Sequence, residues 1–193
     1  MSDSDLPAVL IVDDEPSILE VFEHWLEDDY EVYTALGGED AMALLETEDI
    51  DVVLLDRRMP GFSGDEVLKL IKELGHECQV AMVTAVEPDL DIIEMGFDAY
   101  IVKPPTYDGL KATIENLLDR REYPGHRREY WSLLSKRFVL EEQLTRTELE
   151  NSEEYHALLD RIEALETLLG QAKERMAEDT DFISTIRDIE RGN

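Results

Sequence analysis

The stretch VVLLDRRMP, residues 52–60, joins a short apolar run to an aspartate that directly follows it. An uninterrupted run of this length is typical of a strand that is buried on both faces of a parallel sheet. In open α/β sheets, ligands bind at the carboxyl ends of the strands, and Asp56 stands at such an end. The stretch therefore predicts a parallel sheet with a functional carboxylate at the end of one strand.

Similar apolar runs on either side complete the pattern. Three of them are nearly continuous, and a fourth alternates with polar residues and is expected at a sheet edge. The continuous runs are Ala8–Val12, Val80–Val83 and Ala99–Val102, and the weaker run is Tyr30–Thr34. Helical patterns separate the five runs, so the chain alternates as (βα)5. This alternation predicts a doubly wound parallel sheet with strand order 2-1-3-4-5 and helices on both faces.

Residues that suit helix ends support this alternation. Pro16 suits the first position of the first helix, Ser63 suits the N-cap of the third, and Gly75 suits the end of the third. A short helix is expected over Pro88–Met95 and a longer one over Tyr107–Glu122. The apolar face expected of the first helix consists of Ile18, Phe22, Trp25 and Leu26.

Polar residues stand at the carboxyl ends of four of the five strands. Asp13 and Asp14 follow the first strand, Asp56 follows the third, Thr84 the fourth and Lys103 the fifth. In the expected strand order the first and third strands are neighbours, so the three aspartates should converge. Converging carboxylates repel each other unless a cation lies between them, and an all-oxygen site beside a phosphate suits Mg²⁺. The sequence therefore predicts a magnesium site at this end of the sheet.

This pocket suits phosphoryl transfer. Asp56 is a candidate nucleophile that would form an acyl phosphate, while Lys103 and the Thr84 hydroxyl would contact the phosphoryl oxygens. A chance gathering of solvated acids would not explain why these two residues occupy matching strand ends. Phosphatases that form an aspartyl phosphate usually carry a second aspartate two residues after the nucleophile, and Arg58 stands there. We therefore expect no enzyme activity beyond self-phosphorylation from a phosphodonor and autodephosphorylation.

Motifs in a fixed order give the chain a resemblance to a known family. They are DDEP at residues 13–16, DRRMPGFSG at 56–64, TA at 84–85 and YIVKP at 100–104. Together they resemble the receiver domain of two-component response regulators, over roughly residues 6–122. The resemblance implies a soluble signalling protein whose phosphodonor is a sensor histidine kinase and whose cofactor is Mg²⁺.

The resemblance also implies roles for individual residues. Asp56 would be the phosphoacceptor and a metal ligand. Asp14 would bind Mg²⁺ directly, Asp13 would bind it through water, and the backbone carbonyl of Arg58 would be a further ligand. The Lys103–Pro104 peptide bond would be cis, as is common in the family. The phosphoryl-binding and switch residues would be Thr84, Tyr100 and Lys103.

The composition places limits on compartment and partners. The chain has 47 acidic and 18 basic residues and a net charge of −29. Uniform negative charge destabilises a compact fold unless salt screens it, so we infer a halophilic host. Cys78 is the only cysteine, precedes an apolar run and is expected to be buried without a disulfide. No apolar stretch is long enough to span a bilayer and no signal peptide is evident, so a cytoplasmic protein without a membrane partner is expected.

The pattern becomes purely helical after residue 122. We expect a receiver domain over residues 1–122 and a helical domain over residues 123–193. Asn151 and Glu154 resemble a capping box that starts one of its helices. Apolar residues then follow at alternating spacings of three and four, which is a heptad seam. The seam consists of Tyr155, Leu158, Ile162, Leu165, Leu169, Ala172 and Met176.

The simplest architecture for this region is a helical hairpin with a short last helix. The seam either packs within the hairpin or also holds a homodimer as a coiled coil, and the sequence leaves both open. The first helix of the hairpin has a broader apolar face that consists of Tyr130, Trp131, Leu134, Phe138, Leu140 and Leu144. The last helix would use Phe182, Ile183, Ile186 and Ile189.

The helical region resembles the HalX domain, which follows receivers in halophilic archaea. This resemblance implies no chemistry. Two RREY motifs, at residues 120–123 and 127–130, are expected to pair with the acidic surface of the receiver. The region from residue 123 onward has 16 acidic and 10 basic residues, a net charge of −6, which disfavours nucleic acid as a partner. We therefore expect a regulator that relays its signal to protein partners, with an atypical DNA-binding transcriptional regulator as the alternative.

Overall fold

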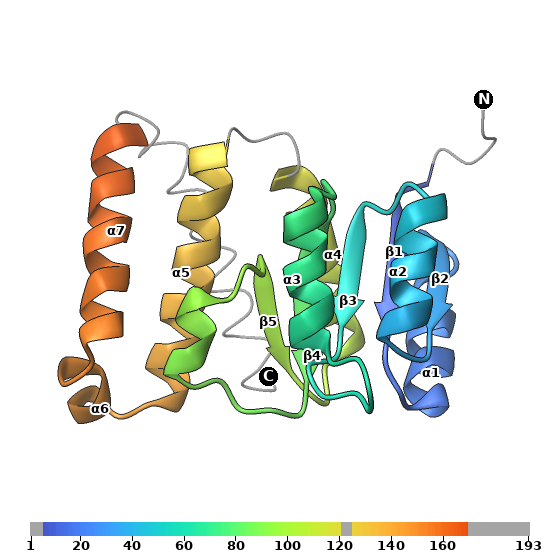
Figure 1. Ribbon diagram of the computed structural model, residues 1–193, viewed down its shortest axis with the longest axis horizontal. Coiled ribbons are helices and arrows are strands. Elements are labelled where there is room, and N and C mark those ends of the chain that lie inside the picture. Colours follow the sequence, from blue (N-terminus) through green and yellow to red (C-terminus); the bar gives the residue numbers. More distant parts are fainter. Residues whose placement is uncertain (1–5, 121–124, 170–193) are drawn as a thin grey trace.

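The computed structural model describes residues 6–120 and 125–169 (Figure 1). Within these ranges a five-stranded parallel sheet has the strand order β2-β1-β3-β4-β5. The predicted fold class and strand order are therefore confirmed. The strands are β1 (Ala8–Val12), β2 (Glu31–Ala35), β3 (Val52–Leu55), β4 (Gln79–Thr84) and β5 (Ala99–Val102).

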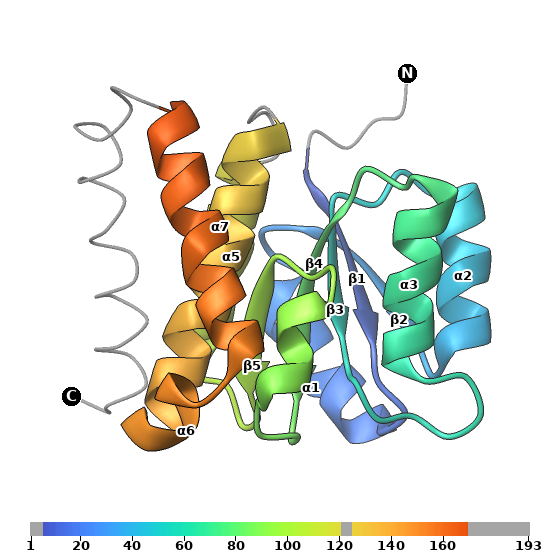
Figure 2. The same ribbon diagram turned by 60° about the vertical axis from the view of Figure 1, so that its left-hand side comes forward.

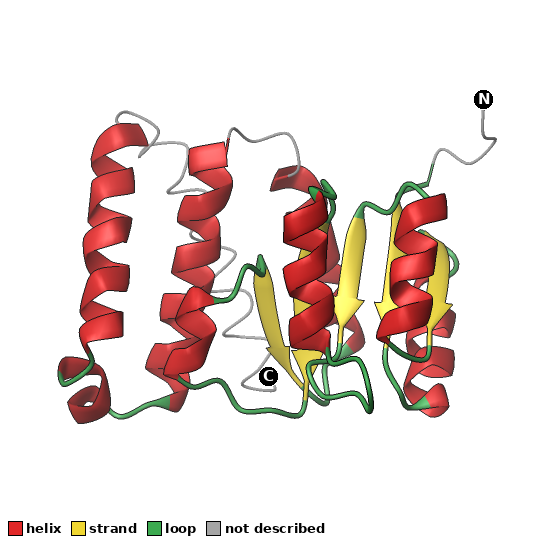
Figure 3. Cartoon of the chain, viewed as in Figure 1, coloured by secondary structure: helices red, strands yellow, loops and turns green. Residues whose placement is uncertain are grey.

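Helices cover both faces of the sheet, as the alternation predicts (Figure 3). On one face lie α1 (Pro16–Leu26) and α4 (Tyr107–Arg120). On the other lie α2 (Gly38–Thr47), α3 (Gly64–Leu74) and the short 3₁₀ helix η1 (Leu90–Glu94). β1, β3 and β4 are buried along their whole length, while β2 is partly exposed at the edge. Three of the four continuous apolar runs thus correspond to strands that are covered on both sides. The fourth, β5, was expected to be buried in the same way, but it lies at the other edge of the sheet and is mostly half-buried.

The expected helix ends are largely confirmed. Pro16 begins α1, and Ser63 caps α3 in a full capping box with Glu66. Gly75 ends α3 in the left-handed conformation, with a φ of 74°. The expected apolar face of α1 needs one correction, because its buried residues are Leu19, Phe22 and Leu26, while Ile18 and Trp25 are half-buried.

The helical region forms a hairpin, which is the arrangement predicted for it (Figure 2). Its long helices are α5 (Gly125–Gln143) and α7 (Glu153–Leu169), joined by the short α6 (Arg146–Glu150). The Tyr130 hydroxyl donates to Glu166 at 2.8 Å, and the Tyr155 hydroxyl donates to Glu141 at 2.7 Å. These pairings run in opposite directions along the two helices, so α5 and α7 are antiparallel.

The heptad seam is buried inside the hairpin of a single chain. Its buried members are Tyr155, Leu158, Ile162 and Leu165, and Leu169 is half-buried. The remaining seam positions and the expected last helix lie outside the described residues. The seam therefore packs within the hairpin, and a homodimer through it stays a prediction.

The capping residues of the hairpin differ from those expected. Asn151 ends α6, and the hydroxyl of Ser152 accepts a hydrogen bond from the Tyr155 backbone N–H at 3.0 Å, so Ser152 caps α7. The predicted box of Asn151 with Glu154 is therefore wrong by one residue. A full capping box does exist one helix earlier, where Thr145 begins α6 with Glu148. The sequence analysis missed α6 because it is only five residues long.

The hairpin and the receiver share one apolar core. The buried side chains beneath α2, α3 and η1 are continuous with those of α5 and α7. Cys78 is buried in this core, as expected, and burial raises the pKa of its thiol to about 11. No helix within residues 6–120 and 125–169 combines the length and apolar character needed to cross a membrane.

Candidate functional site

Three carboxylates gather at the carboxyl ends of β1 and β3, as predicted from their positions in the sequence. Asp13 and Asp14 follow β1, and Asp56 follows β3, its hydrogen-bonded neighbour. One oxygen from each side chain lies within 4.8 Å of the others. Asp13 and Asp56 are buried and Asp14 is half-buried, so the group is open to solvent on one side. Adjacent parallel strands therefore produce an acidic pocket.

Lys103 crosses this pocket from the end of β5. Its ammonium lies 2.5 Å from an Asp13 carboxylate oxygen and 2.7 Å from an Asp56 carboxylate oxygen. Burial alone would lower the pKa of this lysine, but the hydrogen bonds that it donates to Asp13 and Asp56 outweigh burial and raise it. Lys103 therefore stays charged and offsets part of the carboxylate charge. The Lys103–Pro104 bond is cis, as the resemblance implies.

The loop after β3 holds Asp56 in place through backbone contacts. The Arg58 backbone N–H donates to the Asp56 carboxylate at 3.2 Å. The Gly64 backbone N–H donates to the Arg57 carbonyl at 3.0 Å, which closes the loop. A Cβ at Gly64 would lie 2.0 Å from the Asp56 carbonyl oxygen, so only glycine fits at this position. Gly64 belongs to the DRRMPGFSG motif, but no local pattern in the sequence indicates this close approach.

The two expected switch residues meet at a single backbone position. The Thr84 hydroxyl oxygen accepts from the Val86 N–H at 3.3 Å, and the Tyr100 hydroxyl donates to the Val86 carbonyl at 2.7 Å. Both side chains are buried. Burial is the main cause that raises the pKa of Tyr100, so this hydroxyl remains a hydrogen-bond donor. Any displacement of the β4–η1 loop therefore changes a Tyr100 contact.

The donor set of the pocket fits a hard divalent cation. Three carboxylates offer oxygen ligands only, and the half-exposed side leaves room for water or phosphate oxygens. These are the preferences of Mg²⁺, whereas zinc sites in proteins usually include nitrogen or sulfur ligands.

Arg57 is a residue of this region that the sequence analysis did not identify. Its guanidinium forms ion pairs with Asp65 on α3, at 3.0 Å, and with Asp91 on η1. Burial would lower the pKa of Arg57, but the bonds to Asp91 and Asp65 outweigh it, so the net shift is upward. An arginine directly after a buried strand was the available signal. Its partners lie 8 and 34 residues away, so only the tertiary structure reveals them.

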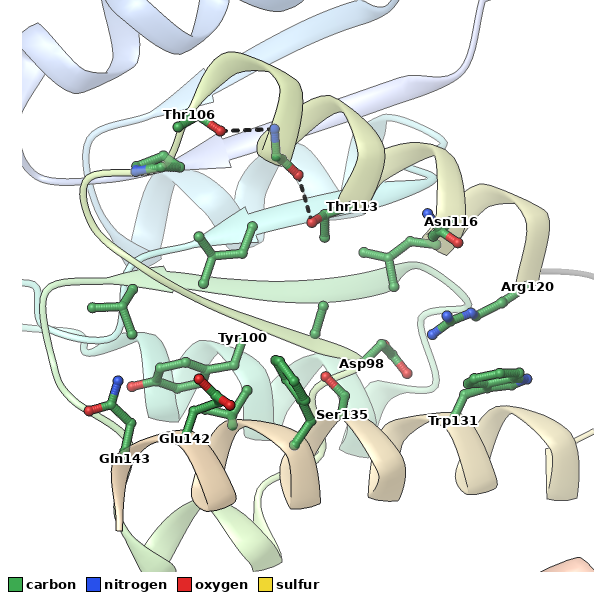
Figure 4. Close-up of a pocket in the computed structure, with 18 of the residues that line it drawn as sticks. Asp98, Tyr100, Thr106, Thr113, Asn116, Arg120, Trp131, Ser135, Glu142 and Gln143 are labelled. Carbon is green, nitrogen blue, oxygen red and sulfur yellow. Dashed lines mark hydrogen bonds between the residues drawn. The ribbon is translucent and has the colours of Figure 1, made fainter. Parts of the chain in front are cut away.

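A cavity of about 450 Å³ lies between the receiver and the hairpin (Figure 4). Its walls are β5 and α4 on one side and α5 on the other. Tyr100 lines one part of it, and at the opposite end the Arg120 guanidinium lies 4.4 Å from the centre of the Trp131 ring. The first RREY motif therefore places Arg120 against an aromatic ring of α5, and residues 121–124 lie outside the described ranges. The interface between the two parts is consequently not close-packed along its whole length.

Two sequence families match the chain in succession. The family described as response regulator receiver domain matches residues 9–115, and the HalX domain matches residues 119–186. A protein of Haloferax volcanii, provisionally named as a transcriptional regulator, is 46% identical over 158 residues. That alignment covers 81% of this chain but only 27% of the relative. The chain thus spans about a quarter of the length of this relative.

Solved structures similar to this chain are receiver domains. One from Methanospirillum hungatei is 32% identical, with a TM-score of 0.58, and covers 61% of this chain and 98% of its own. A response regulator from Thermotoga maritima, solved with Mg²⁺ and beryllofluoride, is 36% identical with a TM-score of 0.53. It covers 58% of this chain and all of its own. In both cases nearly the whole of the solved chain is matched.

Proposed function

This chain belongs to the response regulator receiver family and has a HalX domain after its receiver, and from this premise we propose that it accepts a phosphoryl group on Asp56. The observation that carries the proposal is the pocket itself. Asp56 lies within reach of two further carboxylates, and Lys103 contacts both Asp13 and Asp56. A nucleophile, a cation-binding set and a positively charged side chain are the parts that phosphoryl transfer requires.

The transfer step follows from this geometry. A carboxylate oxygen of Asp56 attacks the phosphorus of a phosphohistidine, a P–O bond forms and the P–N bond breaks. The electron pair of that bond returns to the imidazole, which then takes up a proton. Lys103 would turn from the carboxylates toward the phosphoryl oxygens, and the Thr84 hydroxyl would donate to another of them. When Mg²⁺ is bound by Asp13, Asp14, Asp56 and the Arg58 carbonyl, it neutralises charge on the transferring group.

The partners we propose follow from the two parts of the chain. The phosphodonor is a sensor histidine kinase, because an acyl phosphate forms readily from a phosphoimidazole. The hairpin passes the signal to a protein partner or to a second copy of this chain. We propose no enzyme activity beyond self-phosphorylation and autodephosphorylation. The cell compartment we propose is the cytoplasm of a halophile, which the net charge of −29 supports.

A second function, transcriptional regulation by direct DNA binding, is favoured by one observation. The Haloferax volcanii relative carries the name of a transcriptional regulator. The acidic balance of the hairpin opposes this function, because phosphate contacts supply most of the affinity for DNA. We therefore place protein partners first.

Replacement of Asp56 tests the main proposal. Asp56→Asn should abolish covalent labelling by acetyl phosphate in the presence of Mg²⁺, because an amide cannot form the acyl phosphate. Asp65→Asn removes a carboxylate outside the pocket and should leave labelling intact. Intact-protein mass spectrometry with and without EDTA measures both the label and its metal dependence. Persistent labelling of Asp56→Asn would exclude Asp56 as the phosphoacceptor, and labelling unaffected by EDTA would exclude the metal requirement.

A further inference from the structure

The cavity between the receiver and the hairpin has the size of a binding site for a small organic molecule. Its volume is about 450 Å³, and ligand sites in proteins occupy roughly 300–1,000 Å³. Such sites are often found where two parts of a protein meet. Close-packed interiors contain few voids larger than a water molecule, so simple packing of α5 on the receiver does not account for this space.

Helix α4 leaves the space open because short side chains face it. Gly109, Thr113 and Asn116 follow one another at spacings of four and three, so they share one face of the helix. All three line the cavity, and Figure 4 shows Thr113 and Asn116 on its α4 side. The larger residues Leu110 and Ile114 are fully buried in the core on that face of the sheet.

The polar side chains of this wall already bond within the helix. The Thr113 hydroxyl donates to the Gly109 carbonyl at 2.9 Å, and the Asn116 side-chain amide donates to the Ala112 carbonyl at 2.7 Å. Buried water requires two to four polar partners for each molecule. These internal hydrogen bonds reduce what the wall offers to water, and the wall therefore suits an organic molecule better.

Much of the remaining wall is aromatic or aliphatic. Tyr100 of β5 and both Trp131 and Phe138 of α5 contribute rings, while Ile101 and Val139 contribute aliphatic groups. Tyr100 and Trp131 lie toward opposite ends of the cavity (Figure 4). Aromatic rings pack favourably on other aromatic rings, in stacked or edge-to-face arrangements. An elongated aromatic body therefore matches the wall.

The end of the cavity beside Trp131 carries a positive charge. Arg120 is only 8% exposed, and its guanidinium lies 4.4 Å from the centre of the Trp131 ring. Stacking uses the face of a guanidinium, whereas its N–H groups lie in the plane and can donate to an oxyanion. Of the two acids among the described wall residues, Asp98 accepts from the Val80 N–H at 2.9 Å and Glu142 is exposed.

We propose that this cavity binds an elongated aromatic anion, with the apolar body between α4 and α5 and the acidic group on Arg120. The site is separate from the acidic pocket and does not depend on phosphorylation of Asp56. The net charge of −29 repels anions from most of the surface, so an anion that binds this protein requires a local cation. The buried guanidinium supplies it.

Two fluorescent probes test the charge requirement on the full chain in molar KCl. 8-Anilinonaphthalene-1-sulfonate has an aromatic body and one negative charge, and N-phenyl-1-naphthylamine has the same body without the charge. The unaltered protein should bind both. Arg120→Met should weaken sulfonate binding about tenfold or more, as for a lost charge-assisted hydrogen bond, and leave binding of the neutral probe unchanged. Arg137→Met, at an arginine of α5 outside the cavity wall, should bind both probes normally.

A second variant and an NMR signal test the location. Ser135 lines the cavity and is half-buried, so Ser135→Phe should fill the space and abolish binding of both probes. Ser17→Phe, which adds the same ring at an exposed position of α1, should leave binding intact. The chain has two tryptophans, and the sulfonate should shift the indole N–H signal of Trp131 but not that of Trp25, which is outside the wall.

The possible results are distinct, and circular dichroism verifies the fold of each variant. The proposal is wrong if the unaltered protein binds neither probe, or if binding survives Ser135→Phe. It is also wrong if a folded Arg120→Met binds the sulfonate as tightly as the unaltered protein. If Arg120→Met does not fold, Ser135→Phe and the Trp131 signal decide. None of these results bears on Asp56 as the phosphoacceptor.

Discussion

At the scale of single residues, the pocket depends on a few positions where alternatives are sterically or electrostatically excluded. Lys103 is largely buried, and its hydrogen bonds to Asp13 and Asp56 outweigh the effect of burial and raise its pKa. Gly64 has no alternative, because the Asp56 carbonyl occupies the space of any Cβ. A residue without a functional group can therefore determine the geometry of Asp56.

Gly64→Ala should disturb the pocket through this contact. A methyl group 2.0 Å from the Asp56 carbonyl oxygen forces the loop to move. We expect a loss of stability of roughly 1–3 kcal/mol, as for other overpacked sites, together with slower labelling of Asp56. Gly37→Ala is the control, because a Cβ there meets nothing within 4 Å. Urea unfolding and acetyl phosphate labelling measure the two effects, and equal behaviour of the two variants would show that the contact is unimportant.

At the scale of elements, the docking of α5 on the receiver includes an unfavourable feature. Lys136 is 5% exposed, and burial lowers the pKa of its ammonium to about 8. The charged groups that influence it come from three directions: Asp98 before β5, Lys72 on α3 and Glu129 on α5. Within residues 6–120 and 125–169 the Lys136 ammonium forms no ion pair, and it donates its hydrogen bond to the Ile93 carbonyl. The cost of burying this charge keeps the docking of α5 weaker than its apolar contacts alone would make it.

The free energy of unfolding should therefore depend on pH through Lys136. The pKa of Lys136 is about 8 in the folded protein, whereas its ordinary value, which applies to the unfolded chain, is 10.5. Between these two pH values the unfolded chain therefore binds more protons than the folded protein. Stability must then increase as the pH rises from about 8 toward 10.5, and the full cost of burial is present below pH 8. Lys136→Met should remove this increase and raise stability at neutral pH.

Chemical denaturation between about pH 7 and pH 9 measures this dependence. Burial raises the pKa of the Cys78 thiol to about 11, so this thiol contributes a dependence of opposite sign, but the contribution is the same in every variant and the difference between variants reports Lys136. Lys69→Met is the matched control, because Lys69 is an exposed lysine on α3. It should retain the pH dependence of the unaltered protein. If Lys136→Met retains it as well, the buried ammonium is not its source.

The seam of α7 provides a second test at the scale of elements. Ile162 and Leu165 are buried against α5, so Ile162→Asp with Leu165→Asp places two charges in an apolar interface. Burying two unpaired carboxylates there should cost several kcal/mol and unfold the hairpin, while Asp56 should still accept a phosphoryl group. Circular dichroism measures helicity, and Ala164→Asp, at an exposed position of the same helix, is the control.

Light scattering on the same variants tests the homodimer. If the seam also holds two chains together, the unaltered protein should be a dimer and the doubly substituted protein a monomer. Unchanged helicity together with an unchanged mass would contradict both the hairpin packing and the dimer.

At the scale of the whole molecule, the charge of −29 is spread over the surface and acts against compactness. Exposed charges of one sign repel each other over about 10 Å at 0.1 M salt and about 3 Å at 1 M. The receiver and the hairpin share one core, so the repulsion acts on a single folded body.

The melting temperature should consequently rise with KCl concentration from 0.1 M upward, as screening increases. A variant with Glu20, Glu23 and Asp28 neutralised to amides should show a weaker rise, because these exposed acids of α1 and its end contribute to the repulsion. Differential scanning calorimetry measures both slopes. A melting temperature that does not change with KCl would contradict the inference of a halophilic host.

Much of the fold and of the pocket could be predicted from the sequence alone. Strands buried on both faces appear as continuous apolar runs, and the order of the runs places their polar ends together. Asp13, Asp14, Asp56, Thr84 and Lys103 could be found in this way because each ends a strand or lies within two residues after it. A local pattern and one rule about parallel sheets are sufficient for these positions.

Only the tertiary structure decided how the hairpin meets the receiver. α5 packs on β5 and η1 on one side and on α7 on the other, so its apolar residues do not form a single stripe. A helix covered on two sides has no clear periodicity of apolar residues. A lysine in its sequence, such as Lys136, is therefore expected to be exposed to solvent although it is buried. The pairs Arg57–Asp91 and Lys136–Ile93 join residues 34 and 43 positions apart, and no local pattern specifies such distances. The sequence determined the acidic pocket, and long-range packing decided what that pocket is connected to.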